Sequence, residues 1–392
     1  MLNIDNNLDT NIYLLNTWFR KVAEHRAAKR FVYDQPCTPL KLIGEITDKI
    51  PMSLDSSIGV MFTIEWAMYL EKAGYCDITL ISDKYDHVMK QYCDKIIGCE
   101  YMTLDEIKEK DMKFDVVVGN PPYQKSASDG GKKTEPIWHL FVEKSLNILK
   151  DGGHLGMVHP SGWRNVDGKF KNTQKLLMEN TINYLEMHDA VDGTAMFGVS
   201  TTYDWYSLEK TPNVTKSKTT INNGDYEIYI NSMQFIPNGH FSEISNLIAT
   251  HDEARTTVLH SRGAYGSDNG NMSEVKDEVF CYPCAMNVGQ SDEITKFWYS
   301  NTDRNGHFGT PKIIMGMFGS GLVIDPTGEY GLCQNVSAIV DDVENLENIK
   351  KAMQSEKFLK ISALCSTGGV SRNLFNYKAL ATFRKDFWKD FI

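Results

Sequence analysis

The stretch Phe114–Gln124, FDVVVGNPPYQ, decides the fold. Its consecutive valines favour a strand that is covered on both faces, as in a parallel sheet between two layers of helices. The strand must end where two consecutive prolines begin, because proline has no N–H to donate to a neighbouring strand. Open parallel sheets bind ligands at the carboxyl ends of their strands. The sequence therefore predicts a buried parallel strand that carries Gly119–Tyr123 to a binding edge.

Strands and helices alternate on both sides of this stretch. The predicted strands are 56–62, 77–82, 100–103 and 154–159, and the predicted helices are 64–73, 85–97, 104–109 and 136–149. A further helix is expected before them, with Thr38 as its cap and Pro39 at its first position. Such alternation is typical of βαβ units. The predicted fold class is therefore α/β, with a doubly wound and mostly parallel sheet.

The chain is too long for one ordinary domain, with 392 residues. We expect a helical N-terminal extension over residues 1–35, an α/β domain over 36–210 and a second domain over 211–392. The second domain is predicted to be irregular and mixed α/β, because glycine-rich stretches such as SRGAYGSDNGN at 261–271 are typical of loops and hairpins.

Composition limits the classes of partner and compartment. The formal net charge is −10, which argues against nucleic-acid binding through bulk charge. No apolar run is long enough for a membrane helix and no signal peptide is recognisable, so a cytoplasmic protein without membrane contacts is expected. Eight cysteines in a chain of this length predict free thiols. The single CxxC pair, Cys281 and Cys284, lacks a matching second pair, and no metal is expected.

The loop at Asn120 has a specific chemical capacity. Its prolines remove two donors, so the Asn120 side-chain oxygen and the Pro121 carbonyl are acceptors with few competing donors. Two fixed acceptors suit the two hydrogens of an exocyclic amine, and they favour a tetrahedral nitrogen whose lone pair can attack a methyl group. Tyr123 offers a face on which a planar base can stack. The alternative is a plain strand-ending turn built from Pro121 and Pro122.

At these residues the sequence resembles the amino-methyltransferases, and in particular the gamma-class adenine-N6 DNA methyltransferases of restriction–modification systems. The similarity covers about residues 36–210 and follows the gamma-class order: a Thr-Pro element, the cofactor strands, Asn-Pro-Pro-Tyr, GGHLGMVHPSGW and a strand pair. The resemblance implies a Rossmann-like class I methyltransferase fold, S-adenosyl-L-methionine as cofactor, double-stranded DNA as substrate and a C-terminal target-recognition domain. Any restriction activity would belong to a separate endonuclease.

The resemblance also assigns roles to single residues. Thr38 corresponds to the position that closes over the methionine end of the cofactor, and Asp83 to the acid that binds its ribose hydroxyls. Glu100 lies in a weak match to the element near the cofactor's adenine. Phe197 corresponds to a second aromatic against the extruded base, with an ordinary core residue as the alternative. Asp83 has the alternative of a turn or capping aspartate.

The first cofactor strand departs from the family pattern. The glycine-rich loop is replaced by DSSIGVMF at 55–62, in which only Gly59 remains. We expect Ser56 and Ser57 to line a rebuilt cofactor loop, with Gly59 as a further cofactor-binding residue and Glu65 in reach of the amino group; the alternative is poor cofactor affinity. The missing glycines keep open a non-catalytic DNA-binding protein on a degenerate methyltransferase fold. A protein N5-glutamine methyltransferase is a further alternative, since a glutamine amide also presents an NH₂ group, although a compact enzyme of that kind would not need the long second domain.

The C-terminal stretch is locally basic. From Lys357 onward it contains seven Lys or Arg and two Asp. Basic side chains of this kind contact DNA phosphates, with a solvated helix surface as the alternative for each. The predicted DNA-binding residues are Lys357, Lys360, Arg372, Lys378, Arg384 and Lys385.

Overall fold

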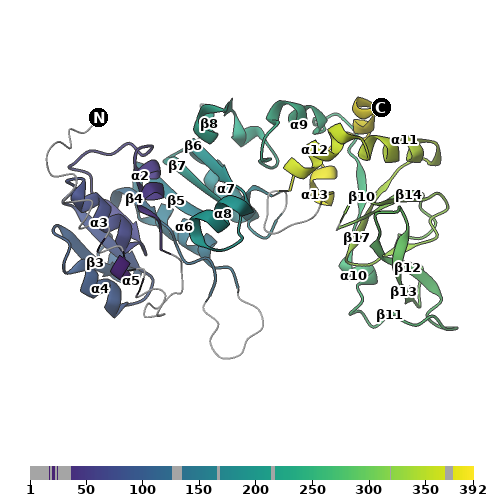
Figure 1. Cartoon of the computed structure of the whole chain (residues 1–392), viewed down its shortest axis with the longest axis horizontal. Coiled ribbons are helices and arrows are strands. Elements are labelled where there is room, and N and C mark those ends of the chain that lie inside the picture. The colour runs from purple at the N-terminus through teal and green to yellow at the C-terminus, as the bar shows by residue number, and fades with distance from the viewer. Residues whose placement is uncertain are drawn as a thin grey trace. The chain divides into compact units, whose positions relative to one another are not determined.

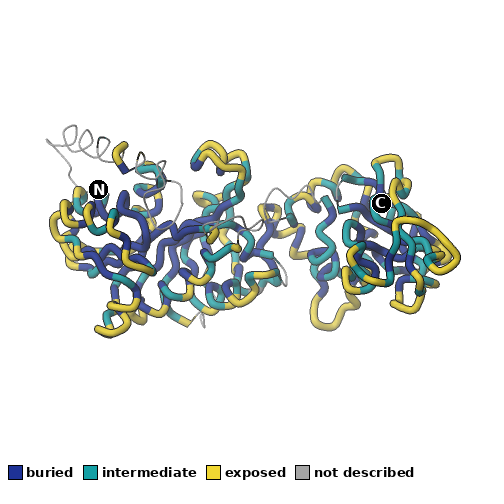
Figure 2. Tube along the Cα trace, turned by 90° about the horizontal axis from the view of Figure 1, so that it is seen from below, coloured by how far each residue is buried: buried dark blue, intermediate teal, exposed yellow. Residues whose placement is uncertain are grey.

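The computed structural model describes residues 37–125, 135–165, 168–212, 217–317, 319–366 and 374–392, together with Thr17, Arg20–Val22 and Glu24. These five isolated residues are helical, and Val22 is fully buried. The rest of the predicted extension over 1–35 lies outside the described residues. The chain divides into two compact units, the first comprising Met1–Trp163 and Lys169–Ser232, the second Arg164–Gly168 and Met233–Ile392. Each has a buried interior of its own, dark blue in Figure 2.

Unit 1 is built on one large sheet (Figure 1). Among the described residues nine strands hydrogen-bond in the order β3-β2-β1-β4-β5-β7-β6-β8-β9. Their bounds are β1 Ile58–Met61, β2 Ile78–Ser82, β3 Cys99–Thr103, β4 Phe114–Gly119, β5 Leu149–Pro160, β6 Asn180–His188, β7 Tyr203–Pro212, β8 Thr219–Ile221 and β9 Tyr226–Ile228. Strands β1 to β5 are mutually parallel, and β7 runs antiparallel between β5 and β6.

Helices connect the parallel strands. Their bounds are α2 Leu40–Thr47, α3 Ile64–Lys72, α4 His87–Cys93, α5 Leu104–Glu109, α6 Trp138–Ile148, α7 Lys171–Met178 and α8 Ala190–Phe197. Helix α2 packs on α3, and α6 packs on α7. The strand order reverses at β1, with β2 on one side and β4 on the other. Right-handed crossovers then place α3 and α6 on opposite faces, and the carboxyl ends of β1 and β4 form the switch point where doubly wound sheets bind ligands.

The predicted α/β class is confirmed, and the differences are local. Helix α6 runs directly into β5, which begins at Leu149, whereas the sequence predicted that this strand begins at residue 154. Strand β6 was not predicted at all. Thr38 does not cap α2: the N-cap is Pro39, with no side-chain cap, and the Thr38 hydroxyl binds elsewhere.

Unit 2 combines two small sheets with short helices. One sheet has the order β10-β17-β14-β15 and the other β11-β13-β12-β16 among the described residues. The strands are β10 Thr257–Leu259, β11 Met272–Ser273, β12 Tyr282–Val288, β13 Ile294–Ser300, β14 Lys312–Gly316, β15 Leu322–Asp325, β16 Gly331–Leu332 and β17 Val336–Val340. The helices are α9 Phe241–Leu247, α10 Arg262–Tyr265, α11 Val343–Met353, α12 Glu356–Leu364, α13 Tyr377–Leu380 and the 3-10 turn η4 Phe387–Phe391. This is the irregular, mixed architecture that the sequence predicted.

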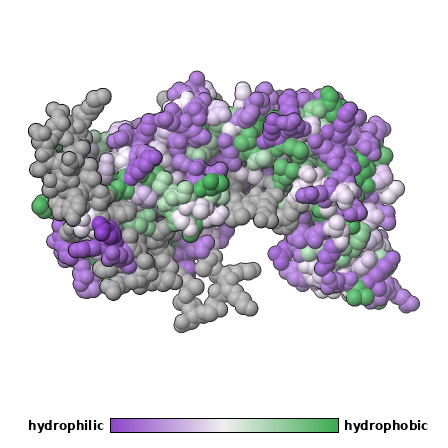
Figure 3. Space-filling model, viewed as in Figure 1, coloured by the Kyte–Doolittle hydropathy of each residue, from purple (hydrophilic) through white to green (hydrophobic). Residues whose placement is uncertain are grey.

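The hydropathy of the described surface and of the helices bears on whether a segment could span a membrane. Hydrophilic residues dominate the described surface in the view of Figure 3, with apolar residues scattered among them. No helix among the described residues is long and apolar enough to cross a membrane.

A buried ion pair holds the β14–β15 hairpin. Lys312 and Asp325 lie opposite each other on the two strands, their charged atoms are 2.7 Å apart, and both side chains are almost fully buried. The Lys312 ammonium also donates to the His307 carbonyl, and the Asp325 carboxylate accepts from the main chain of Glu329 and Tyr330. Breaking such a pair leaves the remaining charge buried without its counter-ion.

We therefore expect Asp325→Ala to lower the free energy of unfolding by about 3–5 kcal/mol. Urea denaturation followed by tryptophan fluorescence measures this loss. The exposed Asp303 provides the control, since Asp303→Ala removes a carboxylate without leaving a buried charge. A loss below about 1 kcal/mol for Asp325→Ala would show that the pair does not stabilise this unit.

Candidate functional site

The site begins where β1 and β4 end side by side. Gly119, the last residue of β4, pairs with Met61, the last residue of β1. A Cβ atom at Gly119 would lie 2.5 Å from the Met61 carbonyl oxygen, so only glycine permits this close approach. As a result, Asn120 leaves the sheet directly beside the turn that follows β1.

Two threonines hold Asn120, which is 1% exposed. Its main-chain N–H donates to the Thr63 hydroxyl at 3.0 Å, and its side-chain amide nitrogen donates to the Thr38 hydroxyl at 3.1 Å. The Thr63 hydroxyl in turn donates to the Met61 carbonyl at 2.9 Å. The structure thus brings the predicted residues Thr38 and Asn120 together and adds Thr63, which the sequence analysis missed.

The rest of the loop packs inward. Pro121 and Pro122 are buried, and Tyr123 is half-buried. The Tyr123 hydroxyl is buried without a hydrogen-bond partner among the described residues. Burial, and secondarily the Tyr203 phenol, raise the pKa of Tyr123 well above its usual range. Tyr123 is therefore a neutral phenol, and its buried hydroxyl is the kind of costly group that is often found at functional sites.

Phe197 ends helix α8 and packs in an aromatic group formed by Phe197, Tyr203 and His188. Its ring meets that of Tyr203 edge-on at 5.0 Å, and Tyr203 stacks on His188 at 4.3 Å. Phe197 is 9% exposed, so most of its side chain belongs to the core of unit 1. Tyr203, a residue of β7 that the sequence analysis did not single out, thus contacts Phe197 and also influences the phenol of Tyr123.

A cleft of about 580 Å³ opens next to this aromatic group. It lies over β6 and β7, where Tyr184 and Trp205 stack at 5.0 Å. Its lining includes Tyr203, Met196, Glu45 of α2 and Lys49, which follows α2. The residues that line it do not include Asn120 or any other residue of the Asn-Pro-Pro-Tyr loop.

The predictions for Ser56 and Gly59 are corrected by the strand bounds. Ser56 precedes β1 and accepts from the main chain of Ser53, while Gly59 lies inside β1. Both residues are therefore away from the carboxyl edge. Gly59 serves packing instead, because a Cβ atom there would lie 2.9 Å from Ile81 and 3.2 Å from Phe114.

The turn at the carboxyl end of β1 has only two residues, Phe62 and Thr63, before α3 begins. Phe62 adopts the left-handed conformation with φ of +61°, which glycine adopts at lower cost. Its ring is buried and meets Phe141 of α6 at 4.7 Å. Packing thus compensates for a conformation that costs a non-glycine residue of the order of 1–3 kcal/mol. Glu65 follows in the first turn of α3, fully buried, and accepts from the Cys37 thiol at 2.8 Å.

Asp83 and Glu100, the two remaining acids predicted to bind the cofactor, lie toward opposite ends of the parallel strands. Asp83 directly follows β2 at the carboxyl edge, as predicted for a ribose-binding acid, and forms an ion pair with Lys144 of α6. Glu100 is exposed and is the second residue of β3. It pairs with Thr79, the second residue of β2. It therefore lies toward the amino edge, and the prediction that it contacts the cofactor is corrected.

His159 is the penultimate residue of β5 and is fully buried. Its ring stacks on Trp138 at 4.3 Å, and its Nε2 lies 3.1 Å from the Tyr206 hydroxyl. Burial lowers the pKa of His159 to about 4, and the hydrogen bond with the Pro160 carbonyl only partly opposes this. His159 is therefore neutral in the folded protein at physiological pH.

This burial makes stability depend on pH. Unfolded His159 takes up a proton near pH 6.5, whereas folded His159 does so only near pH 4, so its contribution is complete above about pH 6.5 and is lost as pH falls to about 4. The loss corresponds to about 3 kcal/mol. We expect His159→Phe to flatten this part of the pH dependence in urea denaturation, and the exposed His251→Phe to leave it unchanged. Equal slopes for wild type and His159→Phe would contradict the assignment.

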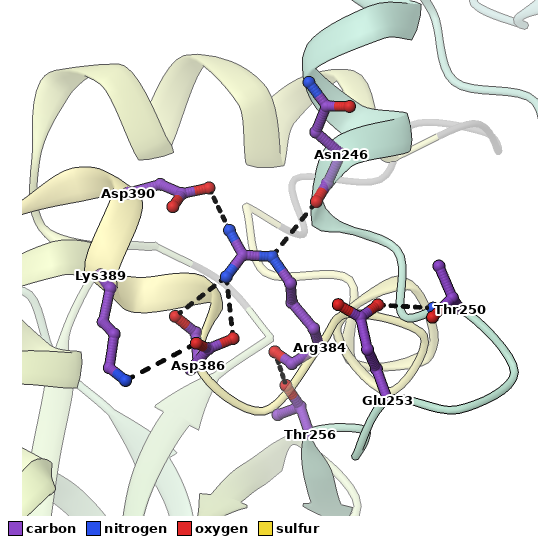
Figure 4. A network of polar contacts seen from close by, with 8 residues as sticks. All are labelled: Asn246, Thr250, Glu253, Thr256, Arg384, Asp386, Lys389 and Asp390. Carbon is purple, nitrogen blue, oxygen red and sulfur yellow. Dashed lines mark hydrogen bonds and ion pairs between the residues drawn. The ribbon is translucent and has the colours of Figure 1, made fainter.

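The predicted DNA-binding residues differ in how they are engaged within unit 2. The Arg384 guanidinium donates to Asp386 at 2.8 Å, to the Asn246 carbonyl at 3.2 Å and to Asp390 (Figure 4). Arg384 is the main cause of a lowered pKa at Asp386. This guanidinium joins α9 to the C-terminal turn η4, and the contact of Arg384 with phosphate stays a prediction.

The lysines of the same stretch are more accessible. Lys360 forms an exposed pair with Glu356 at 2.7 Å, Lys385 lies 3.8 Å from Asp342, and Lys357 is exposed above the Phe391 ring. Lys378 lies half-buried on α13, and Arg372 lies outside the described residues. Surface pairs of this kind contribute little to stability and can exchange for a phosphate. The described residues contain no group of three or more His, Cys, Asp or Glu that could hold a metal ion.

Sheet and loop together define the class of protein. A doubly wound sheet in which the antiparallel strand β7 lies between β5 and β6, with an Asn-Pro-Pro-Tyr loop at the end of β4, is a class I methyltransferase fold. Residues 65–197 match the family model described as Eco57I restriction-modification methylase. The resemblance to restriction–modification adenine methyltransferases is thereby confirmed over this part of the chain.

Two proteins of known sequence are similar to part of this chain. The type II restriction enzyme and methyltransferase RM.Eco57I of Escherichia coli is 30% identical over 126 residues, which are 28% of this chain and 12% of that protein. An uncharacterized adenine-specific methylase of Mycoplasma pneumoniae is 32% identical over 117 residues, 29% of this chain and 24% of that protein. The chain thus spans at most a quarter of these relatives' lengths.

Similarity to solved structures is more remote. A methyltransferase subunit of the type I restriction-modification system of Streptococcus thermophilus has 17% identity and a TM-score of 0.35, covering 49% of this chain and 47% of that one. A similarity this low adds no argument about activity or partners.

Proposed function

We propose that this protein is an S-adenosyl-L-methionine-dependent DNA adenine-N6 methyltransferase. The observation that carries the proposal is Asn120, buried at the β1–β4 switch point and fixed by Thr38 and Thr63 in a loop rich in acceptors. The match of residues 65–197 to a restriction-modification methylase family supports the same chemistry. The target adenine would be extruded from the duplex, since its amine cannot reach a methyl donor within the stack.

The loop residues have separate tasks in this mechanism. The Asn120 side-chain oxygen and the Pro121 carbonyl accept the two hydrogens of the adenine amine, and this directs the nitrogen lone pair toward the methyl group. Tyr123 offers its face to the extruded ring, and Phe197 is the proposed second aromatic against that ring. The rate enhancement comes mainly from positioning, and no covalent enzyme intermediate is required.

The carboxyl edge fits the donor and acceptor pattern of the cofactor. When bound, S-adenosyl-L-methionine supplies an electrophilic methyl group. Asp83, at the end of β2, would accept hydrogen bonds from two vicinal ribose hydroxyls once Lys144 shifts. The first N–H groups of α3 point past its N-terminus and suit a carboxylate, and the nearby Glu65 suits an amino group.

Unit 2 is proposed to recognise the DNA target. Its accessible lysines, Lys357, Lys360, Lys378 and Lys385, are the candidates for phosphate contacts. Double-stranded DNA is thus the proposed partner, and a separate restriction endonuclease would complete a restriction–modification pair.

Asn120→Ala tests the transfer chemistry. We expect the variant to fold normally and to lose methyl transfer by about 100–1,000-fold, because it removes an acceptor that acts on the developing charge. The measurement is transfer of labelled methyl groups to duplex DNA, with N6-methyladenine identified after digestion. Asn180→Ala is the matched control, since it removes one amide at the opposite edge of the sheet. Full activity of Asn120→Ala would exclude the mechanism, and label in glutamine of a protein extract rather than in DNA would change the substrate class.

Asp83→Asn tests the cofactor position. We expect calorimetric titration to show affinity for S-adenosyl-L-methionine about tenfold or more below that of wild type, because an amide accepts two hydroxyls less well than a carboxylate. The Glu100→Gln and Ser56→Ala variants should bind as wild type does, since both residues lie away from the carboxyl edge. A larger loss in Glu100→Gln than in Asp83→Asn would reverse the assignment.

One observation favours a second candidate, a non-catalytic DNA-binding protein on the same fold. The two-residue turn at Phe62 replaces the glycine-rich loop that lets the family's main chain approach the cofactor. This candidate predicts DNA binding without cofactor binding. The same titration, repeated in the presence of duplex DNA, separates the two candidates.

A further inference from the structure

We propose that Thr38 is a positioning residue for Asn120, acting through the side-chain amide rather than through the cofactor. This inference rests on the proposed function, because positioning matters only if Asn120 binds a substrate amine. Nothing in the resemblance links the two residues, which are 82 positions apart in the chain.

The local structure explains why the Thr38 hydroxyl is available. Sequence pattern predicts that Thr38 caps α2, yet the helix has no side-chain cap and begins after Pro39. Thr38 is 1% exposed, and its hydroxyl accepts from the Asn120 amide nitrogen at 3.1 Å. A buried hydroxyl needs a partner, and here that partner is the residue at the centre of the proposed reaction.

Thr63 fixes the other part of the same residue. It accepts from the Asn120 main-chain N–H while donating to the Met61 carbonyl, so its hydroxyl proton is already engaged. Asn120 is therefore held at its main chain by Thr63 in the turn after β1 and at its side chain by Thr38, two residues before α2. With the amide nitrogen bound to Thr38, the oxygen faces away from Thr38, which is the orientation that accepts a donor amine.

Loss of the Thr38 hydroxyl removes a hydrogen bond that favours one orientation of the Asn120 amide about its last torsion. In the reversed orientation the amide nitrogen would face the substrate amine, and two donors would oppose each other. The methyl-transfer step requires the amine in one geometry, so the effect should fall on kcat more than on substrate affinity.

The experiment compares two substitutions at one position in the full chain. Thr38→Val keeps the shape and removes the hydroxyl, whereas Thr38→Ser keeps the hydroxyl. We expect kcat for DNA methylation to fall by about 10- to 100-fold in Thr38→Val and to recover to within about threefold of wild type in Thr38→Ser. Thr79→Val is the matched control, a buried threonine inside β2 whose loss of a hydroxyl should not change kcat.

Cofactor affinity separates this role from direct cofactor contact. Calorimetric titration with S-adenosyl-L-methionine should give a Kd for Thr38→Val within about twofold of wild type. A drop in cofactor affinity as large as the drop in kcat would overturn the proposal in favour of cofactor binding. Equal kcat for Thr38→Val and Thr38→Ser would also overturn it.

A second readout does not depend on activity. In protein labelled with ¹⁵N at asparagine, the side-chain NH₂ resonances of Asn120 are identified by their absence in Asn120→Ala. They should move in Thr38→Val and stay near the wild-type position in Thr38→Ser and Thr79→Val. Unmoved resonances in Thr38→Val would refute the contact. If wild-type protein transfers no methyl group, the proposed function fails, and these spectra still decide whether Thr38 holds Asn120.

Discussion

The close approach of β1 and β4 at Gly119 is the constraint on which the site depends. The missing side chain lets Gly119 lie against the Met61 carbonyl, where a Cβ atom would be only 2.5 Å away. This contact sets Asn120 within hydrogen-bond reach of Thr63, and the two prolines that follow are buried. A wider spacing of the two strands would separate the Asn-Pro-Pro-Tyr loop from the turn that holds it.

The turn after β1 shows how packing replaces a missing glycine. Phe62 adopts a left-handed conformation, and its buried ring contacts the ring of Phe141 in α6. The turn is therefore rigid and short, and it places Thr63 and the start of α3 at the switch point. A cofactor at this edge would meet helix N–H groups and carboxylates instead of a glycine-rich main chain.

Charges in unit 2 serve its own fold to a greater extent than composition suggests. Lys312 is buried against Asp325, and Arg384 joins α9 to the C-terminal turn through Asp386 and Asp390. Counting basic residues overestimates the surface available to DNA, since a buried or multiply bonded cation cannot exchange its partners cheaply. Lys360, by contrast, forms a single exposed pair with Glu356.

The sequence by itself determined the α/β class, most of the parallel strands and the Asn-Pro-Pro-Tyr loop, because hydrophobic pattern and proline chemistry act locally. Tertiary structure alone decided the rest. The sequence pattern did not predict strand β6, because its polar residues interrupt the apolar pattern. The positions of Ser56, Gly59 and Glu100 relative to the carboxyl edge of the sheet were predicted wrongly, because only strand register shows which end of a strand a residue lies near. The contact between Thr38 and Asn120 joins segments that no local pattern connects, so it exists only once α2 has packed on the sheet.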